Sequence, residues 1–234
     1  MFEVINRGGV AALGFRPWFE RGIEHGFTLK PADFSAQAGE GWRGALVQAH
    51  GVQGLRTLNQ VHGSGIVVTR GGAAGDGTEE PEGDAFIIEQ APPTRLIWGI
   101  KTADCAPILV VAGRHRALIH AGWRGLARGI IAAVLERLPA DERVECIIGP
   151  CAGPEGYEVG REVINALGPA ARVVSPSSEA VYLDVAATAH ALIGVARPNA
   201  SVWRTSLNTV IEPCWHSFRR DRTAAGRSLG FFVV

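Results

Sequence analysis

The sequence has no long apolar run and no excess of charge of either sign. Its 234 residues include 23 Lys and Arg against 23 Asp and Glu, so the formal net charge is zero. Such a chain has no overall positive field to attract nucleic acid or an anionic membrane surface. No apolar stretch approaches the roughly 20 residues that cross a bilayer. The first residues, MFEVINRGGVAALGF, also lack the basic and then apolar pattern of a signal peptide. We therefore expect a cytoplasmic protein that binds neither nucleic acid nor membrane.

Cysteine is scarce: the chain has Cys105, Cys146, Cys151 and Cys214. Because nothing else suggests secretion, reduced thiols are expected, and a special cysteine would be a metal ligand or a nucleophile. Cys146 and Cys214 are expected in the core. Cys151 lies in the turn GPCAGPEG ahead of a predicted helix, a setting that lowers a thiol pKa. It is the rival to Cys105 as a nucleophile, although an incidental role is favoured.

The pattern of apolar residues predicts one α+β domain over residues 1–234, with mixed sheets and flanking helices. Neither GxGxxG nor GxxxxGK[ST] occurs, so no dinucleotide or P-loop site is indicated. Short apolar, β-branched segments predict strands over 55–60, 85–88, 96–100, 107–112, 116–121, 145–150, 206–213 and 228–234. Helices are predicted over 42–50, 124–138, 158–167 and 185–196. Loops are predicted over 31–41 and, exposed and mobile, over 71–84.

The segment TADCAPILVVAGRHRALIHAGWRG, residues 102–125, predicts a hairpin with reactive side chains at its open end. With a loop of four residues, Cys105 lies directly opposite His120, where Cβ atoms are about 4.5–5.5 Å apart. A turn centred one residue later leaves the two residues diagonal, about 7–8 Å apart. The direct pairing suits a zinc ion, which binds sulfur at about 2.3 Å and imidazole nitrogen at about 2.0–2.1 Å. The sequence leaves the register open.

A third ligand has to come from elsewhere among the seven histidines. His62 lies in LNQVHGSG, where a predicted strand runs into a glycine-rich turn that exposes the ring. His25 lies in a similar setting, EHGF, so composition alone does not choose between them.

Several separate motifs resemble one family. They are HGF (25–27), NQVHG (59–63), TADCAP (102–107), HAGWRG (120–125), IGP (148–150) with YEVG (157–160), and SFRRD (217–221) with GR (226–227). In this order they resemble the YfiH-like family. Its members are also called laccase-domain or multicopper polyphenol oxidase-type proteins, purine nucleoside phosphorylases, or peptidoglycan editing factors. The chain departs from the family pattern over 28–42, and of the Asn-Arg pair that follows it keeps only Arg43.

The resemblance implies a fold related to cysteine-hydrolase toxin domains of the CNF type. It also implies a zinc ion held by His62, Cys105 and His120. For substrates it implies purine nucleosides and phosphate, through phosphorolysis of adenosine, inosine and methylthioadenosine and deamination of adenosine. Three protein ligands leave a coordination position open, which is typical of a catalytic zinc. Cu²⁺ could replace Zn²⁺ there, because copper binds such ligands more tightly.

Further site residues are assigned around this centre. Cys105 and His120 are expected to take part in catalysis together with Asp104 and Arg124, whose planar guanidinium could bind a phosphate. Arg43, Gln60 and Trp123 are weaker candidates for substrate contacts. A basic group at Arg219, Arg220, Arg222 and Arg227 is expected on the solvated surface. The protein is expected to be a monomer or a weak dimer.

Three other functions stay open. Cys105 could attack an amide with His120 as its base, giving a Cys/His amidohydrolase that edits peptidoglycan precursors. The domain could also be a non-catalytic zinc-binding module. A copper-dependent polyphenol oxidase is the least favoured, because the sequence has no His-X-His pair of the kind that multicopper centres generally use.

Overall fold

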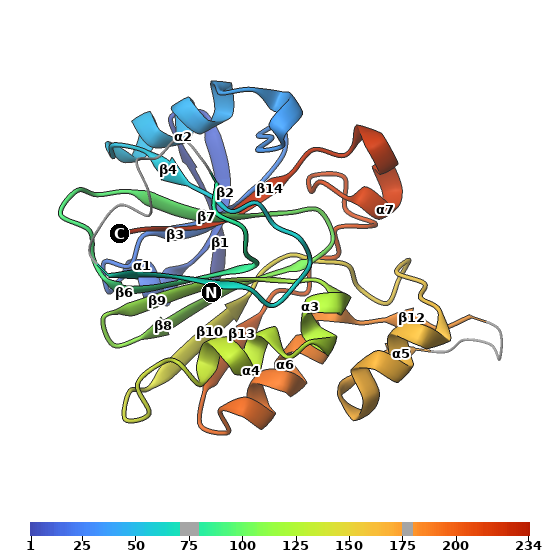
Figure 1. Cartoon of the computed structure of the whole chain (residues 1–234). Coiled ribbons are helices and arrows are strands. Elements are labelled where there is room, and N and C mark those ends of the chain that lie inside the picture. The colour runs from blue at the N-terminus through green and yellow to red at the C-terminus, as the bar shows by residue number, and fades with distance from the viewer. Residues whose placement is uncertain (71–79, 175–179) are drawn as a thin grey trace.

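Two six-stranded sheets pack face to face in the computed structural model, which describes residues 1–70, 80–174 and 180–234. The first sheet has the order β1-β2-β3-β14-β7-β4 and the second β13-β10-β8-β9-β6-β5, and β11 and β12 pair separately. Helices cover the outer face of each sheet (Figure 1). The predicted α+β fold with mixed sheets is confirmed. In the described ranges, no helix is both long and apolar enough to cross a membrane.

The elements have the following bounds. The strands of the first sheet are β1 (Phe2–Arg7), β2 (Val10–Phe15), β3 (His25–Thr28), β4 (Leu55–Arg56), β7 (Ile97–Thr102) and β14 (Ser228–Val233). Those of the second sheet are β5 (Ile66–Arg70), β6 (Ala85–Gln90), β8 (Ala106–Ala112), β9 (His115–Ala121), β10 (Val144–Ile148) and β13 (Ser201–Arg204). The separate pair is β11 (Val173–Val174) and β12 (Tyr182–Leu183). The helices are α1 (Arg16–Phe19), α2 (Gly41–His50), α3 (Trp123–Ala127), α4 (Ile130–Leu135), α5 (Arg161–Leu167), α6 (Val185–Ala196) and α7 (Phe218–Asp221). Short 3₁₀ turns span Ala36–Ala38, Gly168–Ala170 and Arg222–Ala224.

The central strands of the second sheet are buried on both faces. Leu109 and Val111 of β8 pack with Phe27 and Trp98 of the first sheet, in the core between the sheets. Ile108 and Val110, which alternate with them, pack instead under the helices of the outer face. Because successive side chains of a strand point to opposite faces, a strand covered on both sides needs an unbroken apolar run. This explains the segment PILVVA.

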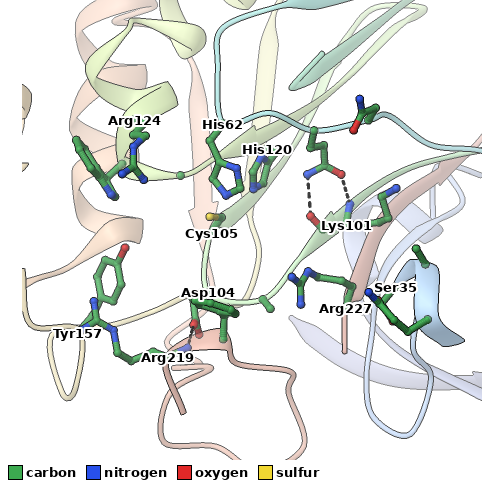
Figure 2. Close-up of a pocket in the computed structure, with 18 residues that line it drawn as sticks. Ser35, His62, Lys101, Asp104, Cys105, His120, Arg124, Tyr157, Arg219 and Arg227 are labelled. Atoms are coloured by element: carbon green, nitrogen blue, oxygen red, sulfur yellow. Dashed lines mark hydrogen bonds between the residues drawn. The ribbon is translucent and has the colours of Figure 1, made fainter. Parts of the chain in front are cut away.

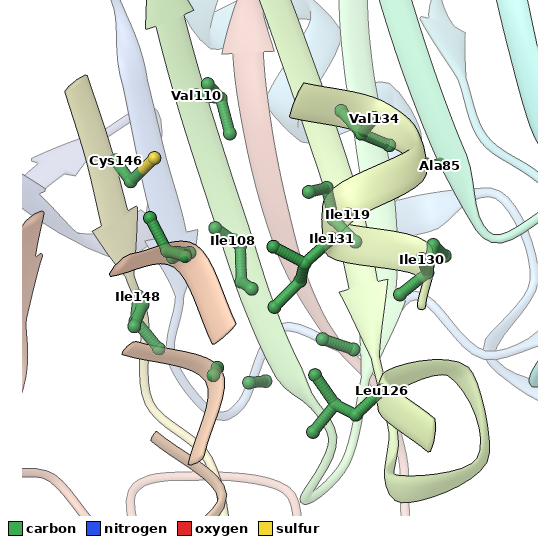
Figure 3. Packing of buried hydrophobic residues seen from close by; sticks show 14 of the residues in the cluster. Ala85, Ile108, Val110, Ile119, Leu126, Ile130, Ile131, Val134, Cys146 and Ile148 are labelled. Atoms are coloured by element: carbon green, nitrogen blue, oxygen red, sulfur yellow. The ribbon is translucent and has the colours of Figure 1, made fainter. Parts of the chain in front are cut away.

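Helices α3, α4 and α6 form the outer layer over the second sheet. Their side chains Leu126, Ile130, Ile131 and Val134 are at most 2% exposed and face the strands β8, β9 and β10 (Figure 3). The apolar side chains of the predicted helix 124–138 are therefore buried against the sheet, but the helix is broken in two. Gly129, at φ 76°, lies in the left-handed region between α3 and α4, where glycine carries little steric cost.

The other predicted elements are mostly confirmed. The strands predicted at 85–88, 96–100, 107–112, 116–121 and 145–150 correspond to β6 to β10, and 228–234 contains β14. The helices predicted at 42–50, 158–167 and 185–196 correspond to α2, α5 and α6. Residues 71–79 of the predicted mobile loop lie outside the described residues.

Two of the predicted strands differ from the structure. The strand expected at 55–60 ends after Arg56, and residues 206–213 form turns in place of a strand. The elements that were not predicted include the hairpin β1–β2 and the strands β3, β5 and β13. In the β1–β2 turn, Gly8 and Gly9 both have positive φ, the combination that tight hairpin turns require. The two adjacent glycines in the sequence RGG (7–9) could have predicted this hairpin turn.

The register of β8 and β9 decides where the reactive residues meet. Ala112 pairs with His115 and Pro107 pairs with His120, so the loop is the two-residue Gly113–Arg114. The direct pairing of Cys105 with His120 is wrong, and the diagonal alternative is confirmed. Both side chains still point to the same face, because the shift is by two residues.

His25 is a structural residue of β3, unlike His62. Its ring is 1% exposed and packs against Trp18 and Phe19. Its Nε2 accepts a hydrogen bond from Phe15 N at 2.9 Å, and its Nδ1 donates to Ile23 O at 2.8 Å. Burial lowers the pKa of His25 from 6.5 to about 4, although the bond to Ile23 acts in the opposite direction.

This neutral ring predicts a loss of stability in mild acid. Below pH 6.5 the unfolded chain binds a proton at His25, whereas the folded protein binds it only near pH 4. The free energy of unfolding therefore falls as the pH drops through this window, by about 2 kcal/mol between pH 7 and pH 5 from this residue alone. In urea titrations at both pH values, His25→Gln should show a smaller loss than the wild type by about that amount. His190→Gln, on the exposed side of α6, should lose as much as the wild type. Equal losses in the wild type and His25→Gln would contradict the assignment.

Candidate metal centre

Three side chains from separate segments converge at one end of the second sheet. His62 lies in the turn that leads to β5, Cys105 directly precedes β8, and His120 lies near the end of β9. One ligand atom from each residue lies within 4.8 Å of the other two. The two imidazole rings meet edge to face, with their centroids 4.8 Å apart, above the Cys105 sulfur (Figure 2). The structure therefore brings together the three predicted ligands.

Glycine at position 122 makes this convergence sterically feasible. In the observed register, Gly122 lies opposite Cys105, just beyond the last pair of β8 and β9. A Cβ atom on Gly122 would lie 2.9 Å from Cys105 Sγ and 3.4 Å from His62 Cδ2. A side chain at this position would therefore displace the Cys105 sulfur and crowd the His62 ring. Close packing against the ligand side chains thus explains why the first glycine of the HAGWRG motif, Gly122, has no side chain.

Charge pairing shifts the pKa values of Cys105, which is partly exposed, and of buried His120. Burial favours the neutral thiol, but the protonated His120 ring and hydrogen bonds from both histidines outweigh burial and lower the pKa of Cys105 to about 6. Burial also favours the neutral imidazole, but the Cys105 thiolate and the Asp84 carboxylate outweigh it and raise the pKa of His120 to about 9. Without a bound cation, the pair is therefore a thiolate and an imidazolium at neutral pH.

A fourth residue, Asp84, supports the group and was missed in the sequence. Its carboxylate is 0% exposed and accepts a hydrogen bond from His120 Nδ1 at 2.8 Å. It also accepts from the backbone N–H groups of His62 and Gly63, at 3.0 and 2.7 Å. Burial would raise the pKa of Asp84, but these donors hold it below its usual value. The local sequence EGDAF gives no signal for this role, because the partners lie more than twenty residues away.

The three ligand atoms face a cavity of about 620 Å³. This volume lies within the 300–1,000 Å³ typical of small-molecule sites. Four cationic side chains line it, namely Lys101, Arg124, Arg219 and Arg227 (Figure 2). Trp123, Tyr157 and Phe218 add aromatic surface. Arg124 lies over the Trp123 ring at 4.4 Å, and Arg219 lies over the Tyr157 ring at 4.8 Å.

Asp104 and Gln60 line the same cavity, but both are engaged with the protein. Asp104 has φ 92°, and its carboxylate accepts from Thr209 Oγ1 at 2.7 Å and from Arg219 N at 2.6 Å. It therefore connects the segment before β8 to α7. Gln60 donates to Lys101 O and accepts from Lys101 N, both at 2.8 Å. These contacts assign both residues a role in building the wall of the cavity.

Three other candidate residues fall in different places. Trp123 and Arg124, at the start of α3, line the cavity as expected. Arg43 does not. It lies in a neighbouring groove, where it contacts Thr57 Oγ1 at 3.2 Å and Glu80 at 3.6 Å. The arginines that were expected to form one basic group on the solvated surface also lie in different places. Arg219 and Arg227 line the cavity, whereas Arg220 donates to backbone carbonyls such as Thr209 O.

The remaining cysteines do not compete with Cys105. Cys151 is 2% exposed, and burial raises its pKa, so the expected lowering by a neighbouring helix is wrong. Cys146 is 0% exposed in the helix-covered core, as predicted, and burial raises its pKa to about 12. Cys214 is exposed, which corrects its assignment to the core.

The donor set fits a tetrahedral cation such as Zn²⁺. One sulfur and two imidazole nitrogens are the ligands that zinc prefers, and three protein ligands leave one position free. Among the described residues, no other His, Cys, Asp or Glu joins the group, and no second group of this kind is found. A carboxylate bonded to the far nitrogen of a ligating histidine, as Asp84 is to His120, is the usual support for such a site.

Fold and site together define a protein in which a His–Cys–His group that could hold a metal ion opens into a cavity of small-molecule size. Residues 32–234 match the family described as multi-copper polyphenol oxidoreductase laccase, and the chain belongs to that family. The resemblance to YfiH-like proteins is thereby confirmed, since relatives and solved structures carry the names YlmD and YfiH.

Two relatives in sequence are named purine nucleoside phosphorylase. The protein from Xylella fastidiosa strain 9a5c is 32% identical over 187 residues, which cover 76% of this chain and 66% of the relative. YlmD from Geobacillus stearothermophilus is 30% identical over 193 residues, 74% of this chain and 69% of the relative. The chain thus matches about two thirds of the length of each.

Solved structures share the whole fold. The crystal structure of YlmD from Geobacillus stearothermophilus has a TM-score of 0.83 and 25% identity, covering 99% of this chain and 98% of that one. The crystal structure of Bacillus licheniformis hypothetical protein YfiH has a TM-score of 0.82 at 21% identity, with 100% and 98% coverage. Both similarities extend from one end of this chain to the other.

The paired charges predict a reactive thiol at neutral pH. In metal-stripped protein, alkylation of Cys105 by iodoacetamide should increase through a midpoint near pH 6, because the thiolate is the nucleophile. His120→Gln removes the positive charge and should move the midpoint up, towards or above the ordinary thiol value of about 8.5. Peptide mass spectrometry measures both, with buried Cys146 as the internal control that stays unmodified. A wild-type midpoint near 8.5 would exclude the thiolate–imidazolium pair.

Proposed function

We propose that this protein is a metal-dependent purine nucleoside enzyme. It would phosphorolyse adenosine, inosine and methylthioadenosine, and deaminate adenosine. The observation that carries the proposal is the set of three ligand atoms within 4.8 Å of one another on the wall of a 620 Å³ cavity. The names of the relatives from Xylella fastidiosa and Geobacillus stearothermophilus support the same substrate class.

The lining of the cavity suits a nucleoside together with phosphate. Purine bases are flat and bind well against aromatic faces, which Trp123 and Tyr157 supply. Phosphate is bound by arginine through pairs of parallel N–H groups. Arg124 and Arg219 each lie across one of these two rings, so base-binding and phosphate-binding groups lie next to each other.

The metal is proposed to be zinc, held by His62, Cys105 and His120. When bound, it would supply a Lewis acid with an open coordination position. Cys105 then acts as a ligand and not as a nucleophile. His120 would bind through Nε2, because its Nδ1 proton is donated to Asp84. Asp104 has both carboxylate oxygens engaged, so it is assigned a positioning role.

In phosphorolysis, a phosphate oxygen bonds to ribose C1′ while the bond from C1′ to purine N9 breaks, and the purine leaves with a proton from the site. The arginines hold the phosphate beside the sugar and balance its charge. In deamination, water adds at purine C6 and ammonia leaves. Both reactions need a nucleophile positioned at one end of a bound nucleoside, where proximity alone lowers the barrier by several kcal/mol.

An assay with adenosine and phosphate tests the proposal. Chromatography of the products should show adenine if phosphorolysis occurs and inosine or hypoxanthine if deamination occurs. Omitting phosphate should remove adenine formation and leave deamination unaffected. His62→Ala removes a ligand whose side chain is exposed, so it should abolish turnover with little loss of stability. No product beyond that of His62→Ala would refute the proposed function.

A Cys/His amidohydrolase is a second candidate, supported by one observation. Cys105, His120 and Asp84 form a continuous chain of hydrogen bonds, with the carboxylate orienting the imidazole beside the thiol. This is the arrangement of nucleophile, base and orienting group in cysteine hydrolases. Such an enzyme would remove wrongly built peptidoglycan precursors. Its thiol has to be free of metal during catalysis.

Metal content separates the two candidates. Purified protein should contain about one zinc per chain, and Cys105→Ala should lose it, because removing one of three ligands leaves too few. Plasma emission spectrometry on both proteins, prepared in parallel, measures this. Metal-free wild-type protein that hydrolyses an amide would instead favour the amidohydrolase.

Two remaining functions have less support. A multicopper oxidase needs several copper sites, whereas the described part of the chain has a single group of His, Cys, Asp and Glu residues that could hold a metal. A purely structural zinc normally has four protein ligands, and here three ligands face a cavity. Copper in place of zinc at this one site remains compatible with the donors.

A further inference from the structure

One buried carboxylate lies behind both histidines of the metal centre. Asp84 directly precedes β6 and is 0% exposed. Its Oδ1 accepts from His120 Nδ1 at 2.8 Å and from His62 N at 3.0 Å, and its Oδ2 accepts from Gly63 N at 2.7 Å. Three donors from two separate segments therefore share one acceptor group.

For His120, the contact selects one tautomer. Donation from Nδ1 to the carboxylate leaves Nε2 as the nitrogen that carries a free lone pair. A carboxylate in this position also increases the basicity of the imidazole and fixes the rotation of the ring. The backbone reinforces the geometry, because His120 N donates to Asp84 O at 2.8 Å.

For His62, the contact holds the backbone and not the ring. His62 is exposed and has φ 58°, a left-handed conformation that is strained for a non-glycine residue. Burial therefore does not fix the orientation of this ligand. The two bonds from His62 N and Gly63 N to Asp84 hold the turn, and Arg128 Nη1 donates to His62 O at 3.3 Å.

We propose that Asp84 is the positioning residue that sets the metal affinity of the centre by orienting both histidine ligands at once. This inference rests on the metal site of the proposed function, but not on nucleoside chemistry. Asp84 then holds the turn at 60–65 and strand β9 in the same arrangement, because it accepts hydrogen bonds from both.

Asparagine cannot replace Asp84 in this role, although it has nearly the same shape. All three neighbouring groups are donors, and an amide offers only one acceptor atom. If its oxygen faces His120 and His62 N, its NH₂ group meets Gly63 N. If it is reversed, NH₂ meets His62 N and forces the proton of His120 onto Nε2, the nitrogen needed for the metal. Either orientation leaves a buried donor without an acceptor.

Zinc affinity of metal-stripped protein, measured by competition with a chromophoric chelator, tests the proposal. Asp84→Asn should weaken zinc binding about 10- to 100-fold, the range typical of groups that orient metal ligands. Asp33→Asn is the matched control. Asp33 also accepts two backbone N–H groups, from Ser35 at 2.8 Å and Arg227 at 2.7 Å, but it contacts neither histidine. Its zinc affinity should equal that of the wild type.

Two results would overturn the proposal: wild-type affinity in Asp84→Asn, or an equal loss in Asp33→Asn. If Asp84→Asn does not fold, NMR of zinc-loaded, ¹⁵N-labelled wild type decides. His120 should then show a proton on Nδ1 that is protected from exchange, and a proton on Nε2 would refute the assignment. Nucleoside turnover is measured separately. Its absence, combined with a loss of affinity in Asp84→Asn, would refute the proposed function and leave this inference standing.

Discussion

Burial of the hairpin strands β8 and β9 on both faces is the constraint on which the site depends. Since β8 and β9 are apolar on both sides, any slip of one residue would exchange the core between the sheets with the core under the helices. The two-residue turn at Gly113–Arg114 then selects the register in which Pro107 faces His120. Cys105 consequently lies just outside the strand, opposite Gly122, with its sulfur free to face a cation. The rigid hairpin thus supplies two of the three ligands in a fixed geometry.

The third ligand, His62, is held in place by hydrogen bonds to its backbone and not by a strand. His62 belongs to an exposed turn in a left-handed conformation, so neither packing nor regular secondary structure positions it. A single buried carboxylate, Asp84, bonds to that turn and to His120. The electrostatic consequence is a row of alternating charges from Asp84 through His120 to Cys105. Such a row is stable in a buried place only because each charge has a partner.

The sequence predicted much of the fold, for reasons that differ between elements. The strands β6 to β10 were predictable because a strand buried on both faces has a continuous run of apolar residues. Helix α6 was predictable because its capping residue Asp184 and its apolar face can both be recognised from neighbouring residues in the sequence. The prediction of a strand at 206–213 was wrong, because the segment VIEP has the composition of a strand but forms turns in the structure. The helix predicted at 124–138 is divided at Gly129 in the structure. The spacing of apolar residues does not show that this glycine adopts a left-handed conformation. Arg43 was assigned to the cavity on resemblance alone and lies in the groove beside it.

By itself, the sequence determined which residue types were available for chemistry: one thiol and one imidazole at the open end of a hairpin, and a histidine in a glycine-rich turn. These follow from local pattern, because strands and tight turns are set by neighbouring residues. Only the tertiary structure decided that His62 joins them, that Gly122 leaves them room, and that Asp84 supports both histidines. The physical reason is that a buried carboxylate is stable only beside its donors, and here those donors lie more than twenty residues away in the chain.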